Sequence, residues 1–594
     1  VTSSAQITAP GAIVLVEATS NNEATAEVTS VSAGGFTLDV MLADAIIAGS
    51  TLAQFDGDLV DAPTDAASLT VRARAENTAT SDVDVFSVAV AGGAGAVATA
   101  EVQGDTQALV GSSSTIYVSG GVTVDAQTFD ASGDGAHNDA EAVVEIDSVT
   151  FAVSITVTGA VAKISGAVRA KLNGTVGRSN AVTVLAVGTQ DAHADADVLG
   201  IGLGLAFSAA STLAEITSSA NVEALNESGS LQSTGLVSVE AIGTMKATTV
   251  SQLATGGLAA GGVSLPTAKI GGGVKALVNG NVTGASALDV IATADRDVAA
   301  TAQAFALGLG AVNAQDSLAE ITDAADTEAT IGSGSTVTIG NGDITVNALT
   351  NNSAVAEAKA KTFGIAVSVT TVEPVANVYG DTHAFLNGNV GATTTGIGPD
   401  GVSGTLGIAG ARHIDVKASA VDRAHSVVKS TTVGIVSVDP SNADARTQPT
   451  VTAQFGAGHI TGSGNVTLLA ESLTDADSDT DSSGGGLVNV QVLRSRVYAN
   501  PTVTATVQGG LVQAEGTLRI EARHGEQAPD FSDGTIASYD LGADSITFDK
   551  DHGLVQGDII TYQLGDGQSN NGETEIGGLT DGGDYGVILT TDSK

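Results

Sequence analysis

The chain contains no cysteine and no tryptophan, and aromatic residues make up only 3% of its 594 residues. The lack of cysteine excludes disulfides and thiolate metal sites, and it suits an exported bacterial protein that needs no oxidative folding. Because aromatic side chains are so scarce, a core has to be built from Ala, Val, Ile and Leu. The hydrophobic fraction of 42% is large enough for such a core.

Basic residues are also scarce: 23 Lys and Arg stand against 66 Asp and Glu, which gives a formal net charge of −43. Binding to nucleic acid requires clustered cations, so we expect no nucleic-acid partner. An anionic membrane surface is disfavoured for the same reason. The excess of negative charge favours solubility through self-repulsion, with cation binding as the alternative.

Long apolar runs are missing too. Runs such as Val198–Ala210 fall short of the roughly 18–20 residues that cross a bilayer, so we expect no membrane insertion. The sequence starts at Val1 with residues that resemble the repeat, and it ends inside an expected strand. Both features indicate a segment of a longer protein.

What the chain does contain is a repeat. Each unit opens with a five-residue motif, in which two aliphatic residues and a final Ala are separated by single variable residues. The steps between its copies are 55, 53, 60, 55, 51, 56, 70, 52 and 52 residues. A recurring period of this length indicates a solenoid, a propeller or an array. The units start near Val14, Leu69, Val122, Val182, Val237, Leu288, Ile344, Ile414, Val466 and Leu518.

Within each unit the apolar residues recur with a period of two, which predicts strands and not helices. Rows of small residues, such as Ala300, Ala302 and Ala304, would let two sheets approach more closely than the usual ~10 Å. One unit cannot cover its own apolar face, so units must stack. We predict an all-β fold over residues 1–529, a flattened β-solenoid (β-helix) with repeats of ~52 residues. Propeller blades are the rival, but their aromatic signatures are absent. The sequence is compatible both with one wide coil per unit and with several ordinary coils per unit.

The repeat also has a double period. Ala162–Val176 is echoed by Ala268–Val282 after 106 residues, and Leu213–Thr217 returns at Leu318–Thr322 after 105 residues. Alternate units therefore match better than neighbours, as duplication of a two-unit block would explain. From about Asp530 the sequence pattern changes and predicts short strands that are separated by Asp/Gly turns. Residues 530–594 are predicted to form a small, truncated β-module.

One local motif fits a calcium loop. Asp130, Ser132, Asp134, Gly135 and Glu141 match a twelve-residue loop with oxygen ligands at positions 1, 3, 5 and 12 and Gly at position 6. The motif lies in a unit longer than most of its siblings, so we expect an inserted loop at the rim. Its flanks are strands, not helices, and a solvated acidic turn is the alternative. Ca²⁺ is the cofactor that the sequence suggests.

A second acidic stretch, TDADSDTDSSGGG, contains four alternating aspartates. On a strand they would share one face, and such crowding of like charge favours a bound cation. As a calcium loop, however, the stretch lacks the expected Gly and the final Glu. We therefore favour a solvated loop. The four residues are Asp475, Asp477, Asp479 and Asp481.

No pattern favours catalysis. The eight histidines are scattered without HxH or HExxH spacing, and no GxSxG nucleophile elbow stands at a strand–helix turn. The enzymatic alternative is a β-helix protein that binds or degrades polysaccharide, with paired carboxylates in a groove lined by aromatic residues. Acids are plentiful but aromatics are nearly absent, so we expect no enzyme.

The repeat text resembles the β-solenoid shafts of giant bacterial surface and matrix proteins, including filamentous haemagglutinin-like adhesins. The resemblance is carried by the opening phrases of the units and by strands of VxAxVxG type at Val274–Val282, Thr450–Gly456 and Thr502–Gly509. The stretch His552–Val587 looks like a short module that recurs in such proteins. The resemblance implies a secreted, extracellular or cell-surface, elongated and non-catalytic protein for adhesion or matrix building.

We therefore expect a structural segment of an extracellular bacterial filament, matrix fibre or adhesin stalk. Unpaired strand edges at the ends of a solenoid can pair head to tail, so copies of the same chain are the expected partners. Polysaccharide of the cell surface or matrix is a further candidate partner. The strands around Phe207 and Phe305 are apolar on both faces, and burial against another chain is the alternative use for them.

Overall fold

The computed structural model describes residues 5–60, 65–128, 138–397, 403–408 and 410–525, together with four short strands between Ile536 and Gly586. Every regular element in these ranges is a strand, and the strands pair in parallel except in three two-stranded sheets. The predicted all-β solenoid is thus confirmed. No helix in the described ranges is long and apolar enough to cross a bilayer. The chain divides into two compact units, Val1–Arg523 and His524–Lys594.

In the first unit, one sequence repeat forms one wide coil. In the fourth repeat, β13 (Ala181–Gly202) runs outward, the chain turns, and β14 (Leu205–Ile216) runs back against it. The short strands β15 (Val222–Asn226) and β16 (Ser230–Gln232) then lead to the next outward strand, β17 (Leu236–Gly256). We call the outward and returning strands together the arm, and its two sides the outward layer and the return layer.

The arm strands form an 18-stranded sheet. Four strands run through the turn and belong to both layers: β2 (Ile13–Ile47), β5 (Ser68–Val102), β21 (Ala287–Gln315) and β25 (Asp343–Val372). The other outward strands are β8 (Gly121–Thr128), β9 (Asn138–Thr150), β31 (Ile414–Val433), β35 (Val466–Gly485) and β39 (Leu518–His524). The other return strands are β10 (Val153–Ile164), β18 (Ala259–Ile270), β22 (Leu318–Ile321), β26 (Val375–Val378), β32 (Val436–Thr447) and β36 (Val488–Ala499).

Two further sheets close the base of each coil. Besides β15, the nine-stranded sheet contains β3 (Thr51–Phe55), β6 (Thr106–Val110), β11 (Val168–Leu172), β19 (Val274–Val278), β23 (Thr327–Ile331), β27 (Thr382–Leu386), β33 (Thr450–Phe455) and β37 (Thr502–Val507). Besides β16, the ten-stranded sheet contains β1 (Gln6–Ile7), β4 (Asp58–Leu59), β7 (Thr115–Tyr117), β12 (Thr175–Arg178), β20 (Asn281–Thr283), β24 (Thr336–Thr338), β28 (Asn389–Val390), β34 (His459–Gly462) and β38 (Leu511–Ala514).

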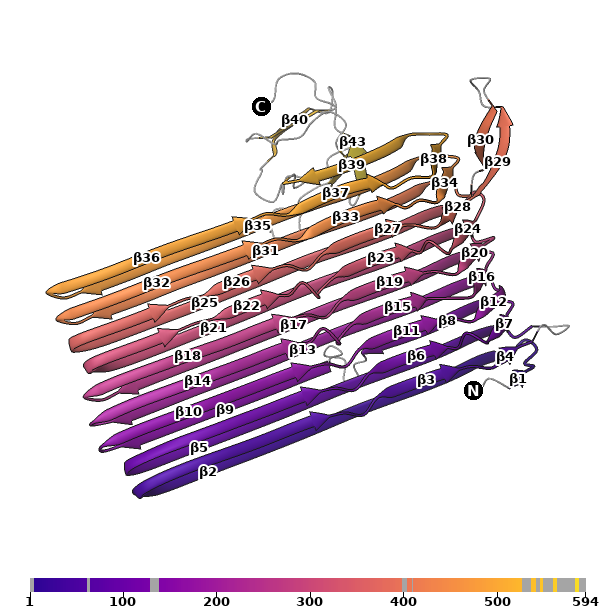
Figure 1. Cartoon of the computed structure of the whole chain (residues 1–594). Coiled ribbons are helices and arrows are strands. Elements are labelled where there is room, and N and C mark those ends of the chain that lie inside the picture. Colours follow the sequence, from indigo (N-terminus) through magenta and orange to yellow (C-terminus); the bar gives the residue numbers. More distant parts are fainter. Residues whose placement is uncertain are drawn as a thin grey trace. The chain divides into compact units, whose positions relative to one another are not determined.

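Successive coils stack in parallel register, so the opening phrase of one unit lies beside that of the next (Figure 1). Val14 pairs with Leu69 and Leu69 with Val122, and the same holds along the later coils. The later pairs follow the predicted unit starts: Val182 with Val237, Val237 with Leu288, Leu288 with Ile344, Ile344 with Ile414 and Ile414 with Val466. Every position of a repeat therefore contacts the equivalent position of its neighbours.

Many of the side chains inside the arm are small or polar. Ser148 Oγ of β9 lies 3.0 Å from Ser154 Oγ of β10, and Ser264 Oγ of β18 donates to Ser251 Oγ of β17 over 2.8 Å. Side chains this short can meet only if the two layers are closer than the ~10 Å usual for stacked sheets. Ala300 is fully buried in the same way. The small face recognised in the sequence is therefore the inner face.

The main aliphatic core lies at the base of the coils, where the outward layer faces the two smaller sheets. Its members are fully buried, and burial of one such side chain contributes about 1.5–3 kcal/mol. Representative members are Leu69, Leu172, Val182, Ile116 and Leu231. The base therefore supplies most of the hydrophobic stabilisation.

The two longest steps of the repeat contain insertions. The 70-residue step between Ile344 and Ile414 contains an antiparallel hairpin, β29 (Ala392–Ile397) and β30 (Ser403–Ile408), which follows β28 (Figure 1). The 60-residue step between Val122 and Val182 contains residues 129–137, between β8 and β9, which lie outside the described ranges. The coils on either side stay in register across both insertions.

A column of glycines brings the backbones of successive coils together at the turn after the nine-stranded sheet. Gly229 has a φ of +87°, and a Cβ there would lie 2.4 Å from the carbonyl oxygen of Gly174 in the preceding coil. A Cβ at Gly280 would lie 2.3 Å from the carbonyl oxygen of Gly229. A larger residue would push the coils apart, so this turn requires glycine.

On the outer face, charges alternate in sign from coil to coil. Lys163, Glu215, Lys269 and Glu320 form one row in register, with ion pairs of 3.8 Å between Lys163 and Glu215 and 3.1 Å between Lys269 and Glu320. Opposite charges stabilise neighbouring strands, whereas like charges destabilise them. Lysine and glutamate each recur in every second coil of this row, which fits the double period of the sequence.

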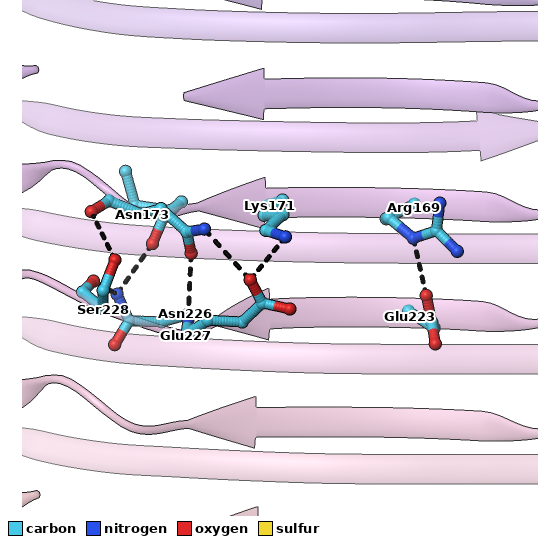
Figure 2. A network of polar contacts seen from close by, with 8 residues as sticks. Arg169, Lys171, Asn173, Glu223, Asn226, Glu227 and Ser228 are labelled. Atoms are coloured by element: carbon cyan, nitrogen blue, oxygen red, sulfur yellow. Dashed lines mark hydrogen bonds and ion pairs between the residues drawn. The ribbon is translucent and has the colours of Figure 1, made fainter. Parts of the chain in front are cut away.

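Figure 2 shows part of a second row of this kind and the polar network beside it. Arg169 Nε donates to Glu223 Oε2 over 2.6 Å, and Lys171 pairs with Glu227. Asn173 Nδ2 also donates to Glu227 Oε2 over 3.1 Å, while the Glu227 backbone N–H donates to Asn173 Oδ1 over 2.9 Å. Burial raises the pKa of Glu227, but the hydrogen bonds from Lys171 and Asn173 hold it below its ordinary value. The network joins two coils through side chains.

In the second unit, the structure describes two antiparallel strand pairs. They are β40 (Ile536–Asp540) with β41 (Ser545–Phe548), and β42 (Ile559–Tyr562) with β43 (Gly583–Gly586). The boundary between the units, at Arg523 and His524, lies a few residues before the boundary of 529/530 expected from the sequence.

The charge rows predict a graded effect of substitution at Glu215. Glu215→Lys places three lysines side by side, so we expect the free energy of unfolding to fall by about 1 kcal/mol at low salt. Glu215→Gln removes the attraction without adding repulsion, and we expect roughly half of that loss. Urea unfolding at low ionic strength and at about 0.5 M salt measures both, and screening should shrink the difference. Equal stability of the two variants at low salt would argue against an electrostatic row.

Candidate functional sites

The predicted calcium loop is only partly described by the structure. Asp130, Ser132 and Asp134 lie outside the described ranges. Glu141 lies in β9, where it pairs in register with Thr80 of β5 and His193 of β13. The loop therefore stays a prediction, and its proposed last ligand is a strand residue on the outer side of the arm.

The four aspartates of the second acidic stretch lie on β35, so the solvated loop that we favoured from the sequence is wrong. Register with β31 explains the strand: His425 pairs with Asp477 and Lys429 with Asp481. All four carboxylates share the outer face, as the strand alternative required, and all are exposed. Basic groups of β31 beside them offset part of their charge.

A groove of about 500 Å³ lies over this part of the arm. His425 Nε2 is 3.4 Å from Asp479 Oδ2, and His425, Asp477 and Asp479 each offer a ligand atom within 4.8 Å of the others. Ca²⁺ takes six to eight oxygen ligands, which three exposed groups, one of them an imidazole, do not supply. Calcium at this row stays a prediction. The titratable residues lining the groove are Glu357, His425, Lys429, Asp479 and Asp481.

A row of acids that the sequence analysis did not single out crosses the outward layer. Asp84 of β5, Glu145 of β9 and Asp197 of β13 lie directly beside one another in register. Burial and then the neighbouring carboxylates raise the pKa of Glu145 and of Asp197 above their ordinary values. Comparison of the same position in successive repeats would have revealed this row. Its like charges repel each other along the stacking direction.

Inside the coils, mostly polar side chains form a row from coil to coil. Asn22 Nδ2 donates to Asn77 Oδ1 over 2.7 Å, and Asn77 Nδ2 donates to Asn138 Oδ1 over 2.8 Å. These two bonds join three successive coils, whereas Asn138 Nδ2 has no hydrogen-bond partner within the described part of the chain. The row continues in register through Gln190, Met245, Arg296, Asn352 and Asp422.

Arg296 is the largest fully buried side chain of the described chain. Burial lowers the pKa of this guanidinium to about 10, so it stays charged at neutral pH. Its protons go to four acceptors: Gly272 O (3.3 Å), Asp326 O (3.0 Å), Thr327 Oγ1 (3.1 Å) and Asn352 Oδ1 (3.3 Å). The cation therefore joins the arm to the turns at the base of the coil.

Asp422 is linked to this cation through Asn352, whose Nδ2 donates to Asp422 Oδ1 over 2.7 Å. Its other oxygen, Oδ2, makes no hydrogen bond within the part of the chain that the structure describes. Burial raises the pKa of Asp422 to about 7, against the opposing effects of Asn352 and Arg296. The row is enclosed by the coils, so its groups act on the register and stability of the stack and not on a substrate.

Comparison with known proteins identifies no relative. No known protein family, no curated protein and no solved structure matches the chain. The resemblance to filamentous haemagglutinin-like adhesins therefore stays a prediction.

Asp422 predicts a pH-dependent stability. The raised pKa means that the folded state binds a proton more tightly than the unfolded state does. The contribution of Asp422 to the free energy of unfolding is therefore fully present below about pH 4. It is lost as the pH rises through about 7. We expect the wild type to lose on the order of 2 kcal/mol from this group between about pH 5 and 8.5. Asp422→Asn, which cannot ionise, should not show this loss.

Urea unfolding of both proteins at the two pH values measures this loss. The other titrating carboxylates contribute equally to both proteins, so they cancel in the difference. A difference between wild type and Asp422→Asn that does not change with pH would contradict the assignment.

Proposed function

We propose that this chain is a non-catalytic structural segment of an extracellular bacterial filament, matrix fibre or adhesin stalk. The observation that carries the proposal is the common register of the coils, in which each strand pairs with its equivalent one repeat away. A stack of this kind can be extended, because a further coil finds the same row of backbone donors and acceptors. That coil can come from the same chain or from another copy.

The dimensions of the first unit favour assembly of copies. Nine strands of the base sheet, spaced by ~4.8 Å, give on the order of 40 Å along the stacking direction. A single outward strand of 22 residues is on the order of 70 Å long at ~3.3 Å per residue. One unit is therefore wider than it is tall, so a longer fibre requires further coils, which copies stacked head to tail would supply.

The distribution of polar contacts also supports a structural role. The ion pairs of Lys163, Lys269 and Arg169 and the amide row of Asn22 and Asn77 all join one coil to the next. Cohesion thus acts along the direction in which a fibre would grow. Secretion to the cell exterior is part of the proposal through the resemblance to adhesin shafts.

A second candidate function is binding or degradation of polysaccharide in the groove over β31 and β35. Glu357 and Asp479 supply two carboxylates there, with His425 and Lys429 beside them, which is the arrangement that the enzymatic alternative needs. None of the residues that line the groove is aromatic. A screen of acidic and neutral polysaccharides, with Lys429→Ala as the control, tests this alternative.

Head-to-tail stacking predicts that β36 is an assembly edge. The N–H of Val488 bonds to Ile435 O of the preceding coil, so by strand alternation the N–H of Gln491 points to the open side. Among the described strands, none pairs with that side of β36. Gln491→Pro removes this donor while leaving the bonds to the preceding coil intact, whereas Gln491→Thr keeps the donor and serves as the matched control.

We expect negative-stain images of the wild type and of Gln491→Thr to show filaments or stacked oligomers. Gln491→Pro should show single units with an unchanged melting temperature, because only the open edge is blocked. Single units for the wild type at high concentration would refute head-to-tail assembly.

A further inference from the structure

The return layer carries a flat apolar strip on its outer face, near the turn of the arm. Three neighbouring rows, which begin at Phe36, Leu38 and Val40 of β2, run in register across the coils to β36. We call these three rows the return strip. The first six positions of its middle row are Leu38, Gly93, Ile155, Phe207, Gly261 and Val312.

Most of the large side chains of the return strip are exposed, from 39% at Val263 to 76% at Phe36, and a few valines such as Val369 and Val438 are half-buried. They lie on the outer face because successive side chains of a strand point to opposite faces, and their neighbours along each strand fill the interior of the arm. The strip's apolar surface is therefore left for contact with a further surface. Isolated exposed apolar residues are ordinary, but a contiguous patch of this kind marks an interaction surface.

Charge is excluded from the return strip. None of its positions from β2 to β36 is Asp, Glu, Lys or Arg, although charged residues make up 15% of the chain. The neighbouring row, which begins at Leu42, already contains Asp316 and Glu373. In a protein with a net charge of −43, this strip is a surface on which two copies can approach without direct repulsion.

The return strip is also flat. The strands from β2 to β36 lie nearly parallel to one another across all coils (Figure 1). Sheets normally twist by about 20–25° per strand, and flat sheets of many strands are typically stabilised by stacking or by side-chain ladders. A flat sheet face with a row spacing of ~4.8 Å fits a second sheet that has the same spacing.

The exposed area is sufficient for a stable complex. A half-exposed aliphatic or aromatic side chain leaves on the order of 80 Å² accessible, so about ten of them equal the ~800 Å² that each partner contributes to a standard interface. The return strip holds that many, from Phe36, Leu38 and Val40 on β2 to Val490 and Val492 on β36.

We propose that the return strip binds the return strip of a second copy of this chain, face to face, in a two-fold symmetric dimer. The second copy is the occupant that is flat, uncharged over the same area and of identical row spacing, and a two-fold interface uses the same patch on both partners. This lateral contact goes beyond head-to-tail stacking and does not depend on it. It would join two stacks side by side.

Sedimentation velocity over a range of concentrations tests the proposal, in the Gln491→Pro background so that stacking through β36 is absent. We expect a monomer–dimer equilibrium that becomes tighter at about 0.5 M salt, because screening weakens the repulsion between the two acidic copies. Val157→Lys places a charge in the strip at a site that is 55% exposed and should weaken the dimer at least tenfold.

Leu52→Lys is the matched control: Leu52 lies on β3, outside the strip, and is 50% exposed. The Leu52→Lys dimer should have the same dissociation constant as the dimer of the parent protein. Thermal melting of both variants checks that each is folded. Because the chain has no cysteine, Val157→Cys and Leu52→Cys add a second measurement, in which a short bifunctional thiol reagent should link copies only through position 157.

A protein that stays monomeric at all concentrations, or equal weakening by Val157→Lys and Leu52→Lys, would overturn the proposal. Flotation with zwitterionic lipid vesicles, without dimer formation, would assign the strip to a membrane surface and would overturn it as well. If Gln491→Pro forms no filaments but still forms dimers, the result supports both the head-to-tail interface at β36 and the lateral interface at the return strip. Dimers without filaments in the wild type would remove head-to-tail stacking alone.

Discussion

The structure depends on one constraint, the parallel pairing of each coil with the next in strict register. Under this constraint every residue lies beside the residue at the same position one repeat away, so the row across coils becomes the unit that must be stable. Amides form hydrogen bonds from coil to coil, as those of Asn22, Asn77 and Asn138 do. Charges alternate, as at Lys163 and Glu215, and glycine is kept where backbones meet, as at Gly229.

The same constraint separates the base of the coil from the arm. At the base, large aliphatic side chains fill the space between the outward layer and two further sheets. In the arm, two layers lie close together, and small or polar side chains fill much of the interior. Many large apolar residues of the return strands point outward, where they form the return strip. An arm of this construction stabilises itself by hydrogen bonds and close packing, and it leaves its apolar surface for contacts with other molecules.

Much of the fold was predictable because its signals are local: the period of two, the recurring opening phrase and the small row at Ala300 all lie within one unit. The placement of Asp475–Asp481 was predicted wrongly because Asp, Ser and Gly are typical of turns, whereas pairing with β31 imposes a strand. Pairing with neighbouring strands regularly overrides intrinsic strand propensity. Arg296 and Asp422 were missed because their hydrogen-bond partners lie 24 to 70 residues away in the sequence. Alignment of the repeats by position would have shown this polar row.

The central claim, coil-to-coil register with one coil per repeat, is tested most directly by engineered disulfides in this cysteine-free chain. Lys163 and Glu215 face outward in register on β10 and β14, at the ~4.8 Å spacing of neighbouring strands that a disulfide can span. Lys163→Cys with Glu215→Cys should form an intramolecular bond on mild oxidation, seen as faster migration in non-reducing electrophoresis. Lys163→Cys with Leu213→Cys, which is shifted by two residues on the same face, should not. Equal bonding in both pairs, or bonding only in the shifted pair, would contradict the register on which the whole account depends.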